Sequence, residues 1–218
     1  MPDILLYAYW RSAASYRVRA ALALKGLEAT EIEVDLSIGA QKGSEYRRIN
    51  PQAIVPTLVH DGTVIHQSLA IVEYLDEVFP ARPLLPADPV GRARVRAIAV
   101  AVAAEIQGRT GTRVREYLEE RWDSETMRDW YRHWGRAACE GVEGLLADHP
   151  DTGVFCHGDT PGMADCFLYP QVCALRRREV DLSGFPTILR IADACAAEPA
   201  FIAAAPDNHA SRAVDLRF

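Results

Sequence analysis

Residues 4–26, ILLYAYWRSAASYRVRAALALKG, join an apolar run, a short polar turn and a second apolar run that ends on glycine. Residues 3–8 predict a strand, and residues 16–26 have helical spacing and predict a helix. Ser12 and Ser15 therefore lie where a strand ends and a helix begins. The start of a helix offers unpaired N–H groups and the positive end of a dipole. This stretch predicts a site that holds an anion or lowers the pKa of a thiol.

The rest of the first 80 residues alternates short apolar segments with turn signals. Residues 30–34 alternate polar and apolar side chains and predict a second strand. Asp61-Gly62 is a hairpin signal between residues 54–59, a strand interrupted by Pro56, and a return strand at 64–65. The other elements are a loop with a short helix at 37–50 and a helix from Gln67-Ser68 to about Val78, with Ser68 a candidate N-cap. The predicted order is β-α-β-α-β-β-α, a small α/β unit.

A proline-rich segment, residues 79–89, predicts a linker to a second domain. No convincing strand follows Gly91, so the second domain is predicted to be all-helical. One helical face collects the apolar side chains of Val95, Ile98, Ala99, Val102 and Ile106, and further helices are expected at 112–122, 124–147, 163–177 and 186–197. Residues 205–218 lack periodicity and predict a surface tail. The expected domains are residues 1–80 and 90–218.

Composition narrows the class of function. The chain has 218 residues and a formal charge of −6, which argues against nucleic acid as a partner. No stretch approaches the about 20 apolar residues of a membrane helix, and no signal peptide is apparent, so we expect no membrane partner and a cytoplasmic location. The five cysteines are irregularly spaced and predict reduced, buried thiols, and the histidines show no metal-ligand spacing, so no metal is expected.

Four motifs together resemble the glutathione S-transferase family, and within it the zeta class. They are Arg11-Ser12-x-x-Ser15-x-Arg17-Val18-Arg19, Asn50-Pro51-x-x-x-Val55-Pro56-Thr57-Leu58, His66-Gln67-Ser68-Leu69-Ala70-Ile71, and Gly158-Asp159 with Met163-Ala164-Asp165. The resemblance covers residues 3–205. It implies a thioredoxin-like α/β domain, an all-α domain and a homodimer. Zeta-class members include maleylacetoacetate and maleylpyruvate isomerases.

The resemblance implies glutathione as the cofactor and assigns residues to it. In the family the proline of Val55-Pro56 is cis, which turns the preceding backbone toward the cysteine amide of glutathione. The helix start at Gln67-Ser68 would receive the glutamyl carboxylate on its N–H groups, although a simple helix cap would explain these residues as well. The other contacts implied are Gln41, Gln107 and the N–H groups of Ala13 and Ala14.

Ser12 is the predicted partner of the glutathione sulfur. A free thiol has a pKa near 8.5, and a helix start and a hydroxyl hydrogen bond both favour the thiolate. Either serine could instead simply cap the helix, and Ser15 stays an alternative to Ser12 in both roles. Arg11, which precedes Ser12, joins these two serines as a candidate catalytic residue.

The chain departs from the family at two places. The usual zeta-class pattern is Ser-Ser-Cys-Ser, whereas this chain has Ser12-Ala13-Ala14-Ser15. Reductive dehalogenases of the class use that cysteine to form a mixed disulfide with glutathione, so this activity is not expected, whereas isomerisation needs only the glutathione thiolate. Gly162 replaces a Ser or Thr cap, and we expect Asp165 to reach back to it.

The expected isomerase substrate carries two carboxylates, which suit the planar fork of arginine. By the resemblance, Arg11, Arg113 and Arg177 are the candidate substrate ligands. Arginines at helix ends can also simply complement the helix dipole, which is the expectation for Arg176 and Arg178. The leading hypothesis is a glutathione-dependent cis–trans isomerase of maleylpyruvate or maleylacetoacetate. The alternatives are a general transferase that conjugates electrophiles and a non-catalytic interaction domain.

Overall fold

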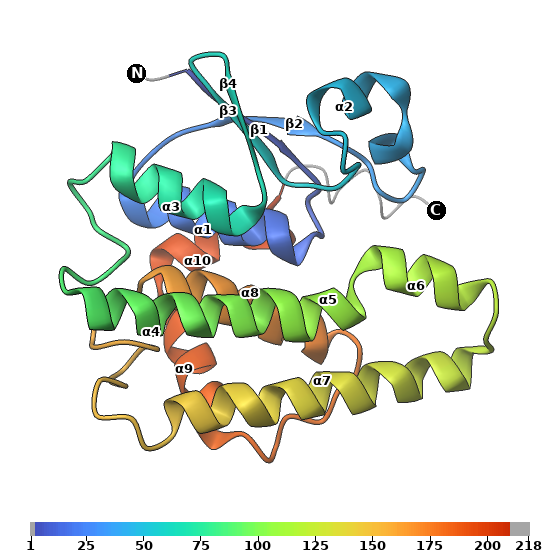
Figure 1. Cartoon of the computed structure of the whole chain (residues 1–218). Coiled ribbons are helices and arrows are strands. Elements are labelled where there is room, and N and C mark those ends of the chain that lie inside the picture. Colours follow the sequence, from blue (N-terminus) through green and yellow to red (C-terminus); the bar gives the residue numbers. More distant parts are fainter. Residues whose placement is uncertain (1–2, 210–218) are drawn as a thin grey trace. The chain divides into compact units, whose positions relative to one another are not determined.

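The central sheet has four strands in the order β2-β1-β3-β4. They are β1 (Ile4–Ala8), β2 (Thr30–Glu33), β3 (Thr57–His60) and β4 (Thr63–His66). β2 runs parallel to β1, and the other two pairings are antiparallel (Figure 1). Each predicted strand is present, but β3 begins only after Pro56, because a proline has no N–H for the ladder.

The computed structural model describes residues 3–209, which divide into two units. The first unit comprises residues 3–84 and 198–209, and the second comprises residues 85–197. From the sequence, residues 90–218 are expected to form one helical domain. By its contacts, the stretch 198–209 instead groups with the sheet, and the remainder of the expected tail, residues 210–218, lies outside the described residues.

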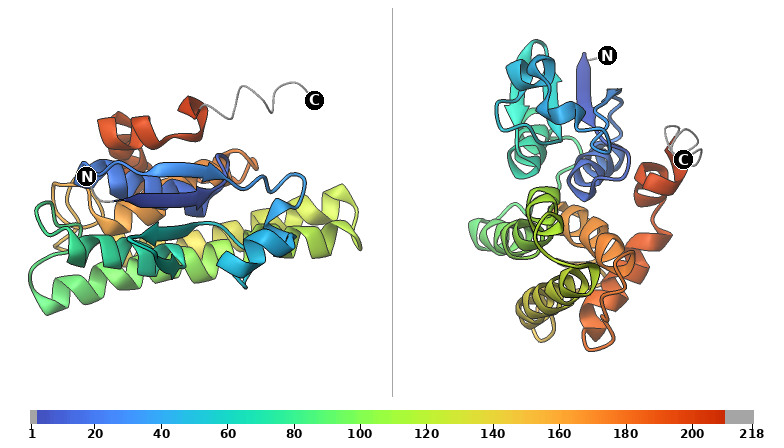
Figure 2. Two further views of the ribbon diagram at one scale, coloured as in Figure 1. Left: turned by 90° about the horizontal axis from the view of Figure 1, so that it is seen from above. Right: turned by 90° about the vertical axis from the view of Figure 1, so that its right-hand side faces the viewer.

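Helices α1 (Ala13–Lys25) and α3 (Ser68–Val78) lie on the same side of the sheet (Figure 2). β1 supplies Ile4, Leu6 and Ala8 to the core, at no more than 2% exposed, while its alternate residue Tyr7 packs near Tyr46 with ring centres 6.0 Å apart. Tyr46 belongs to α2 (Ser44–Ile49), which follows a short 3₁₀ turn, η1 (Ala40–Lys42). The sheet is therefore covered by α1 and α3 on one face and, around Tyr7, by α2 on the other.

Local turn chemistry explains how these elements begin and end. Asp61 and Gly62 both have positive φ, 48° and 79°, so the predicted hairpin turn is present between β3 and β4. α1 ends at Gly26 in the left-handed conformation, as predicted. α1 begins three residues earlier than expected, at Ala13, because Ser12 caps it. Ser68 is the first residue of α3 and Gln67 occupies the cap position, so the prediction of Ser68 as N-cap was wrong.

The last described residues form α10 (Pro199–Ala204) and a 3₁₀ turn, η3 (Pro206–Asn208), neither of which was predicted. α10 packs against α1, where the Tyr16 hydroxyl donates to the Phe201 carbonyl at 2.8 Å. Phe201 and Pro206 are buried, so the described part of the expected surface tail is anchored to the first unit.

The second unit is helical, and residues 85–197 contain no strand. Its elements are α4 (Pro89–Val100), a π-helical segment η2 (Ala101–Ile106), α5 (Gln107–Thr110), α6 (Thr112–Glu119), α7 (Ser124–Leu146), α8 (Met163–Arg176) and α9 (Pro186–Ala197). The predicted apolar face on α4 and η2 is buried, as expected. The chain stays helical through α5 as far as Thr110. The helix breaks at Gly111, where an added Cβ would lie 2.8 Å from the Gln107 carbonyl oxygen.

The start of α8, the central helix of this unit, is held by a buried carboxylate. Asp165 accepts from the Gly162 N–H at 2.9 Å, as predicted, and from the Cys156 N–H at 2.8 Å. All five cysteines are free thiols, and only Cys173 is not fully buried. Within residues 3–209, no helix combines the length and the apolarity needed to cross a membrane.

Candidate functional site

The first feature of the site is the start of α1. Ser12 Oγ accepts a hydrogen bond from the Ser15 N–H at 3.2 Å, and the Ser12 carbonyl accepts from the Tyr16 N–H at 2.9 Å. The first N–H groups of a helix have no acceptor within the helix. At the start of α1 the N–H groups of Ala13 and Ala14 are therefore available to a ligand. Because Ser12 Oγ acts as an acceptor toward the helix, its own hydrogen can be donated outward. Ser12 is partly exposed, so an external acceptor can reach it.

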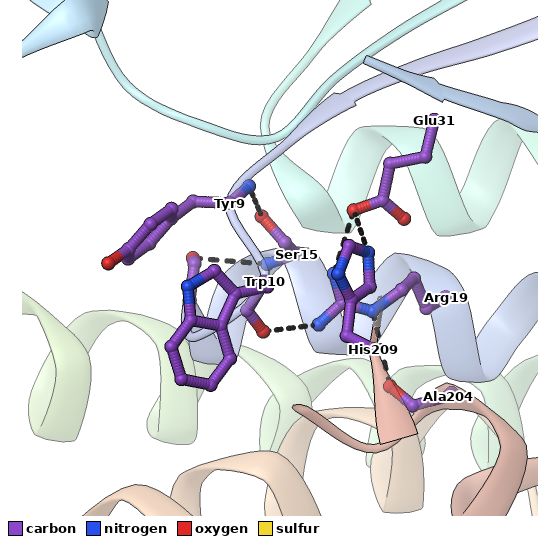
Figure 3. Close-up of polar contacts among 8 residues, drawn as sticks. Tyr9, Trp10, Ser15, Arg19, Glu31, Ala204 and His209 are labelled. Atoms are coloured by element: carbon purple, nitrogen blue, oxygen red, sulfur yellow. Dashed lines mark hydrogen bonds and ion pairs between the residues drawn. The ribbon is translucent and has the colours of Figure 1, made fainter. Parts of the chain in front are cut away.

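Ser15 has a different environment from Ser12. It is completely buried, and its Oγ accepts a hydrogen bond from the Tyr9 N–H at 3.3 Å (Figure 3). This bond joins the end of β1 to the first turn of α1. Ser15 therefore supports the turn from within, whereas Ser12 faces outward from it.

The second feature is the start of α3, where Gln67 has a φ of 70° and a ψ of 124°. Residues other than glycine rarely adopt this conformation, and such strain concentrates at functional sites. No side chain caps the helix, so its first N–H groups are available to an anion. The exposed Gln67 amide donates to Gln52 Oε1 at 2.8 Å.

A buried cation lies behind this helix start. Arg17 is 1% exposed, and its Nη1 donates to Ser68 Oγ at 3.3 Å. Burial lowers the pKa of the Arg17 guanidinium to about 9, so the group still carries its charge at neutral pH. In the sequence Arg17 is part of the first of the four motifs, and no separate role is predicted for it. The sequence feature that could have indicated a role for Arg17 is its place on a helix face whose other residues belong to the core.

The third feature consists of the Val55-Pro56 peptide bond and Gln41, which lie between the two helix starts in the sequence. The Val55-Pro56 peptide bond is cis, as the family resemblance implied. Gln41 is 4% exposed, and its Oε1 has no hydrogen-bond partner among the described residues. A buried carbonyl oxygen without a donor costs about 1–3 kcal/mol. Gln41 is thus a strong candidate to accept a hydrogen bond from a ligand.

The predicted substrate residues belong to different units. Arg11 is an exposed residue of the first unit, and no hydrogen bond or ion pair of its guanidinium occurs within residues 3–209. Arg113, in the first turn of α6, is likewise exposed and unpaired within the described chain. Arg177 is the exposed C-cap of α8, and Gln107 is a half-buried residue that opens α5. Arg113, Arg177 and Gln107 all belong to the second unit.

The two arginines that flank Arg177 have neighbours of their own. Arg176 forms an ion pair with Asp193 at 3.6 Å, and the Arg178 guanidinium lies 4.0 Å from the centre of the Tyr131 ring. Arg176 and Arg178 therefore each have a partner within the second unit, and their expected role of complementing the helix dipole stays a prediction.

One group of residues has the chemistry of a metal site. Ligand atoms of Glu31, Glu33 and His209 lie within 4.8 Å of one another. However, Glu31 Oε1 already contacts Arg19 Nη1 at 3.1 Å and His209 Nε2 at 2.9 Å. The arginine thus supplies the positive charge that a metal ion would bring to this carboxylate.

Comparison with known proteins identifies the family. Residues 2–77 match the family model of the glutathione S-transferase N-terminal domain. The maleylacetoacetate isomerase of Rhizobium meliloti (strain 1021) is 44% identical over 208 residues, which cover 94% of this chain and 97% of that protein. A solved holo structure of a bacterial maleyl pyruvate isomerase, described as a zeta-class glutathione S-transferase, superimposes with a TM-score of 0.91. It is 40% identical and covers 94% of this chain and 98% of that one.

The chain belongs to the zeta class of the glutathione S-transferase family. A second relative of known structure is the maleylacetoacetate isomerase of Anaeromyxobacter dehalogenans 2CP-1, solved with glutathione bound in its active site. It has a TM-score of 0.86 and 39% identity, and it covers 96% of this chain and 97% of that one. The family and the fold expected from the four motifs are therefore confirmed.

Proposed function

We propose that this protein is a glutathione-dependent cis–trans isomerase that converts a maleyl keto-acid, maleylacetoacetate or maleylpyruvate, into its fumaryl isomer. The observation that carries the proposal is the start of α1, where Ser12 keeps a hydrogen for an outside acceptor beside two helix N–H groups. The full-length similarity to isomerases of both keto-acids supports it.

The first unit fits glutathione in the chemistry of its donors and acceptors. Two helix starts suit two of the negative charges of the tripeptide, the thiolate at α1 and a carboxylate at α3. Gln41 Oε1 is a buried acceptor that still needs a donor. When bound, glutathione supplies a thiol nucleophile whose reversible addition allows rotation about the cis double bond of the substrate.

In this proposal Ser12 stabilises the thiolate. Lowering a thiol pKa by two requires about 2.7 kcal/mol, which one charge-assisted hydrogen bond and a helix N-terminus together can supply. The Ala13 and Ala14 N–H groups contribute to the same charge. Neither side chain offers a thiol of its own, so a mixed disulfide with the protein cannot form at this turn.

The carboxylate of the glutamyl residue is assigned to the start of α3. Gln67 and Ser68 provide N–H groups there, and Arg17 adds positive charge from behind Ser68. Because Arg17 can only donate, Ser68 Oγ accepts from it and directs its own hydrogen elsewhere. The Val55 backbone is assigned to the cysteine amide of glutathione, and Gln41 and Gln107 to further contacts with the tripeptide.

Arg11, Arg113 and Arg177 are proposed as ligands of the keto-acid carboxylates. The unpaired guanidinium groups of Arg11 and Arg113 support this role, because a paired arginine would first have to give up its partner. Nearby cationic or N–H groups would also stabilise negative charge that develops on the substrate oxygen. An apolar electrophile would not require these arginines, which favours isomerisation over general conjugation.

The decisive experiment compares turnover of maleylacetoacetate and maleylpyruvate with and without glutathione, beside conjugation of a chloronitrobenzene. We expect isomerisation that stops when glutathione is omitted and resumes when it is restored, with no net consumption of glutathione. Conjugation without isomerisation would establish the general transferase instead. Neither activity, with glutathione still bound, would favour a non-catalytic binding role.

A homodimeric state and a cytoplasmic location are further proposals that rest on the family resemblance and on composition. Light scattering coupled to size-exclusion chromatography tests the first. Fractionation of the cells that make the protein tests the second. A monomer at micromolar concentration, or recovery outside the cytoplasmic fraction, would contradict them.

A further inference from the structure

Arg19 lies at the centre of a buried polar cluster on α1. Its side chain is 9% exposed and donates three hydrogen bonds, shown in Figure 3. Nη2 donates to the Trp10 carbonyl at 2.8 Å, Nη1 to Glu31 Oε1 at 3.1 Å, and Nε to the Ala204 carbonyl at 3.1 Å. One guanidinium thus joins the turn before α1, strand β2 and the end of α10.

The bond to Trp10 acts on the turn that presents Ser12. The turn Trp10–Ser12 connects β1 to α1. Arg11 and Ser12 are the two residues that follow the Trp10 carbonyl in the chain. A second bond, from the Ser12 N–H to the Tyr9 carbonyl at 3.0 Å, closes the turn. Rotation of the Trp10–Arg11 peptide would move both candidate catalytic residues. A charge-assisted hydrogen bond from a fixed side chain opposes that rotation.

The position of Arg19 in the helix explains how it reaches this carbonyl. Arg19 lies seven residues after Ser12, which is close to two full helical turns, so both residues lie on the same side of α1. Side chains in a helix point toward its N-terminus, and a long arginine can therefore reach back to the preceding turn.

The C-terminal residues 199–209 shield this cluster. Phe201 is fully buried against the unit, Ala204 provides an acceptor for Arg19, and His209 Nε2 lies 2.9 Å from the same Glu31 oxygen that Arg19 contacts. Removal of water strengthens a hydrogen bond between partners that satisfy each other. Residues 199–209, of which only 205–209 were expected to belong to a surface tail, therefore complete the environment of Arg19.

We propose that Arg19 is a positioning residue for the reaction: it fixes the Trp10 carbonyl and thereby the orientation of Ser12, and it couples residues 199–209 to the thiolate site. This inference rests on the proposed function, in which Ser12 donates to the bound glutathione thiolate. In this proposal residues 199–209 act on that site through Arg19.

The test replaces Arg19 by Met and by Lys and follows the bound thiol. The titration of glutathione in complex with each variant is read from the ultraviolet absorbance of the thiolate, with affinity measured by calorimetry. For Arg19→Met we expect the thiol pKa to rise by about one, a tenfold loss of thiolate at a pH below it. Addition of Ser12→Ala to Arg19→Met should raise it little further, because Arg19 acts through Ser12. Arg19→Lys keeps a positive charge but cannot donate to all three acceptors, so we expect a thiol pKa between those of the wild type and Arg19→Met.

Lys25→Met is the matched control. Lys25 is also a buried cation on α1 that contacts a carboxylate, Asp76 at 3.0 Å, and a carbonyl, that of Arg82 at 2.7 Å, but it lies at the opposite end of the helix. Lys25→Met should lower the melting temperature as Arg19→Met does and leave the thiol pKa at the wild-type value.

Each result decides the proposal. A thiol pKa in Arg19→Met or Arg19→Lys equal to that of the wild type would overturn it, and Arg19→Lys decides alone if the Met variant does not fold. Equal shifts in Arg19→Met and Lys25→Met would also overturn it, since they would reflect lost stability. If the wild-type protein itself does not lower the pKa of the bound thiol, the proposed role of Ser12 is wrong. That outcome distinguishes a failure of the proposed function from a failure of the Arg19 proposal alone.

Discussion

The Ser15 N–H donates to Ser12 Oγ at 3.2 Å, while Ser15 Oγ is itself bonded to the Tyr9 N–H at 3.3 Å. Both hydroxyl oxygens accept a backbone N–H, but Ser15 is completely buried whereas Ser12 is partly exposed, so only the Ser12 hydroxyl is accessible to a ligand. This arrangement favours the proposal that Ser12 is the serine that contacts the thiolate, and it leads to opposite expectations for the removal of the two serines.

Ser12→Ala should reduce isomerase turnover about 10- to 100-fold, because it removes the hydrogen bond to the thiolate. It should also cost about 1 kcal/mol of stability through the lost helix cap. Ser15→Ala should lower stability by about 1–3 kcal/mol, because the Tyr9 N–H is left buried without its acceptor. Its bound thiol should keep nearly the wild-type pKa. Chemical denaturation and thiolate titration of both variants check this, and the reverse pattern would make Ser15 the catalytic serine.

Gln41→Leu should weaken glutathione binding by about tenfold and leave the protein at least as stable as the wild type. The reason is that Gln41 Oε1 is buried without a donor, so leucine removes a desolvated oxygen that gains its bond only from a ligand. Calorimetric titration with glutathione and thermal denaturation measure the two effects. Lys42→Ala, at an exposed neighbour on the same turn, is the control. Unchanged affinity in Gln41→Leu would remove Gln41 from the glutathione site.

Arg177→Met should raise KM for the keto-acid about 10- to 100-fold while the affinity for glutathione stays as it is. The fork proposed to bind a substrate carboxylate is lost, and a hydrogen bond to a charged group contributes about 1.5–3 kcal/mol. Arg176→Met, which removes only the ion pair with Asp193, should leave KM unchanged. Steady-state kinetics at saturating glutathione separates these cases. A parallel loss of glutathione affinity in Arg177→Met would count against its role as a substrate ligand.

Cysteine labelling should leave the activity intact. Burial raises the pKa of the Cys139 thiol to about 12, so at pH 8 only about one molecule in ten thousand carries its thiolate. Burial also raises the pKa values of Cys156 and Cys166 well above the ordinary range. Half-buried Cys173 should react first with a thiol reagent in native protein, and the others only after denaturation or at much higher pH. Mass spectrometry locates the label, and inactivation in step with labelling of a buried cysteine would contradict a mechanism without a protein thiol.

The sequence by itself determined the elements and their chemistry wherever neighbours along the chain decide them. Apolar periodicity located the strands and most helices, Asp61-Gly62 specified the hairpin, and Asp165 was correctly expected to cap α8. The two helix starts suited to anions were also visible, because a helix N-terminus is a local feature. The element boundaries at Ala13 and Ser68 were less accurate, since capping depends on the backbone conformation of Ser12 and Gln67.

Only the tertiary structure decided what the buried polar groups do. Ser15 is assigned to the Tyr9 N–H, Arg17 to Ser68 and Arg19 to Trp10, Glu31 and Ala204, in pairs separated by 6 to 185 residues. The spacing of residues along the sequence does not predict such partners. Desolvation makes these groups costly to bury unless the fold supplies a partner, and that partner is chosen by packing. For the same reason the segment 198–209, whose last five residues were expected to belong to a surface tail, groups with the unit that holds Ser12.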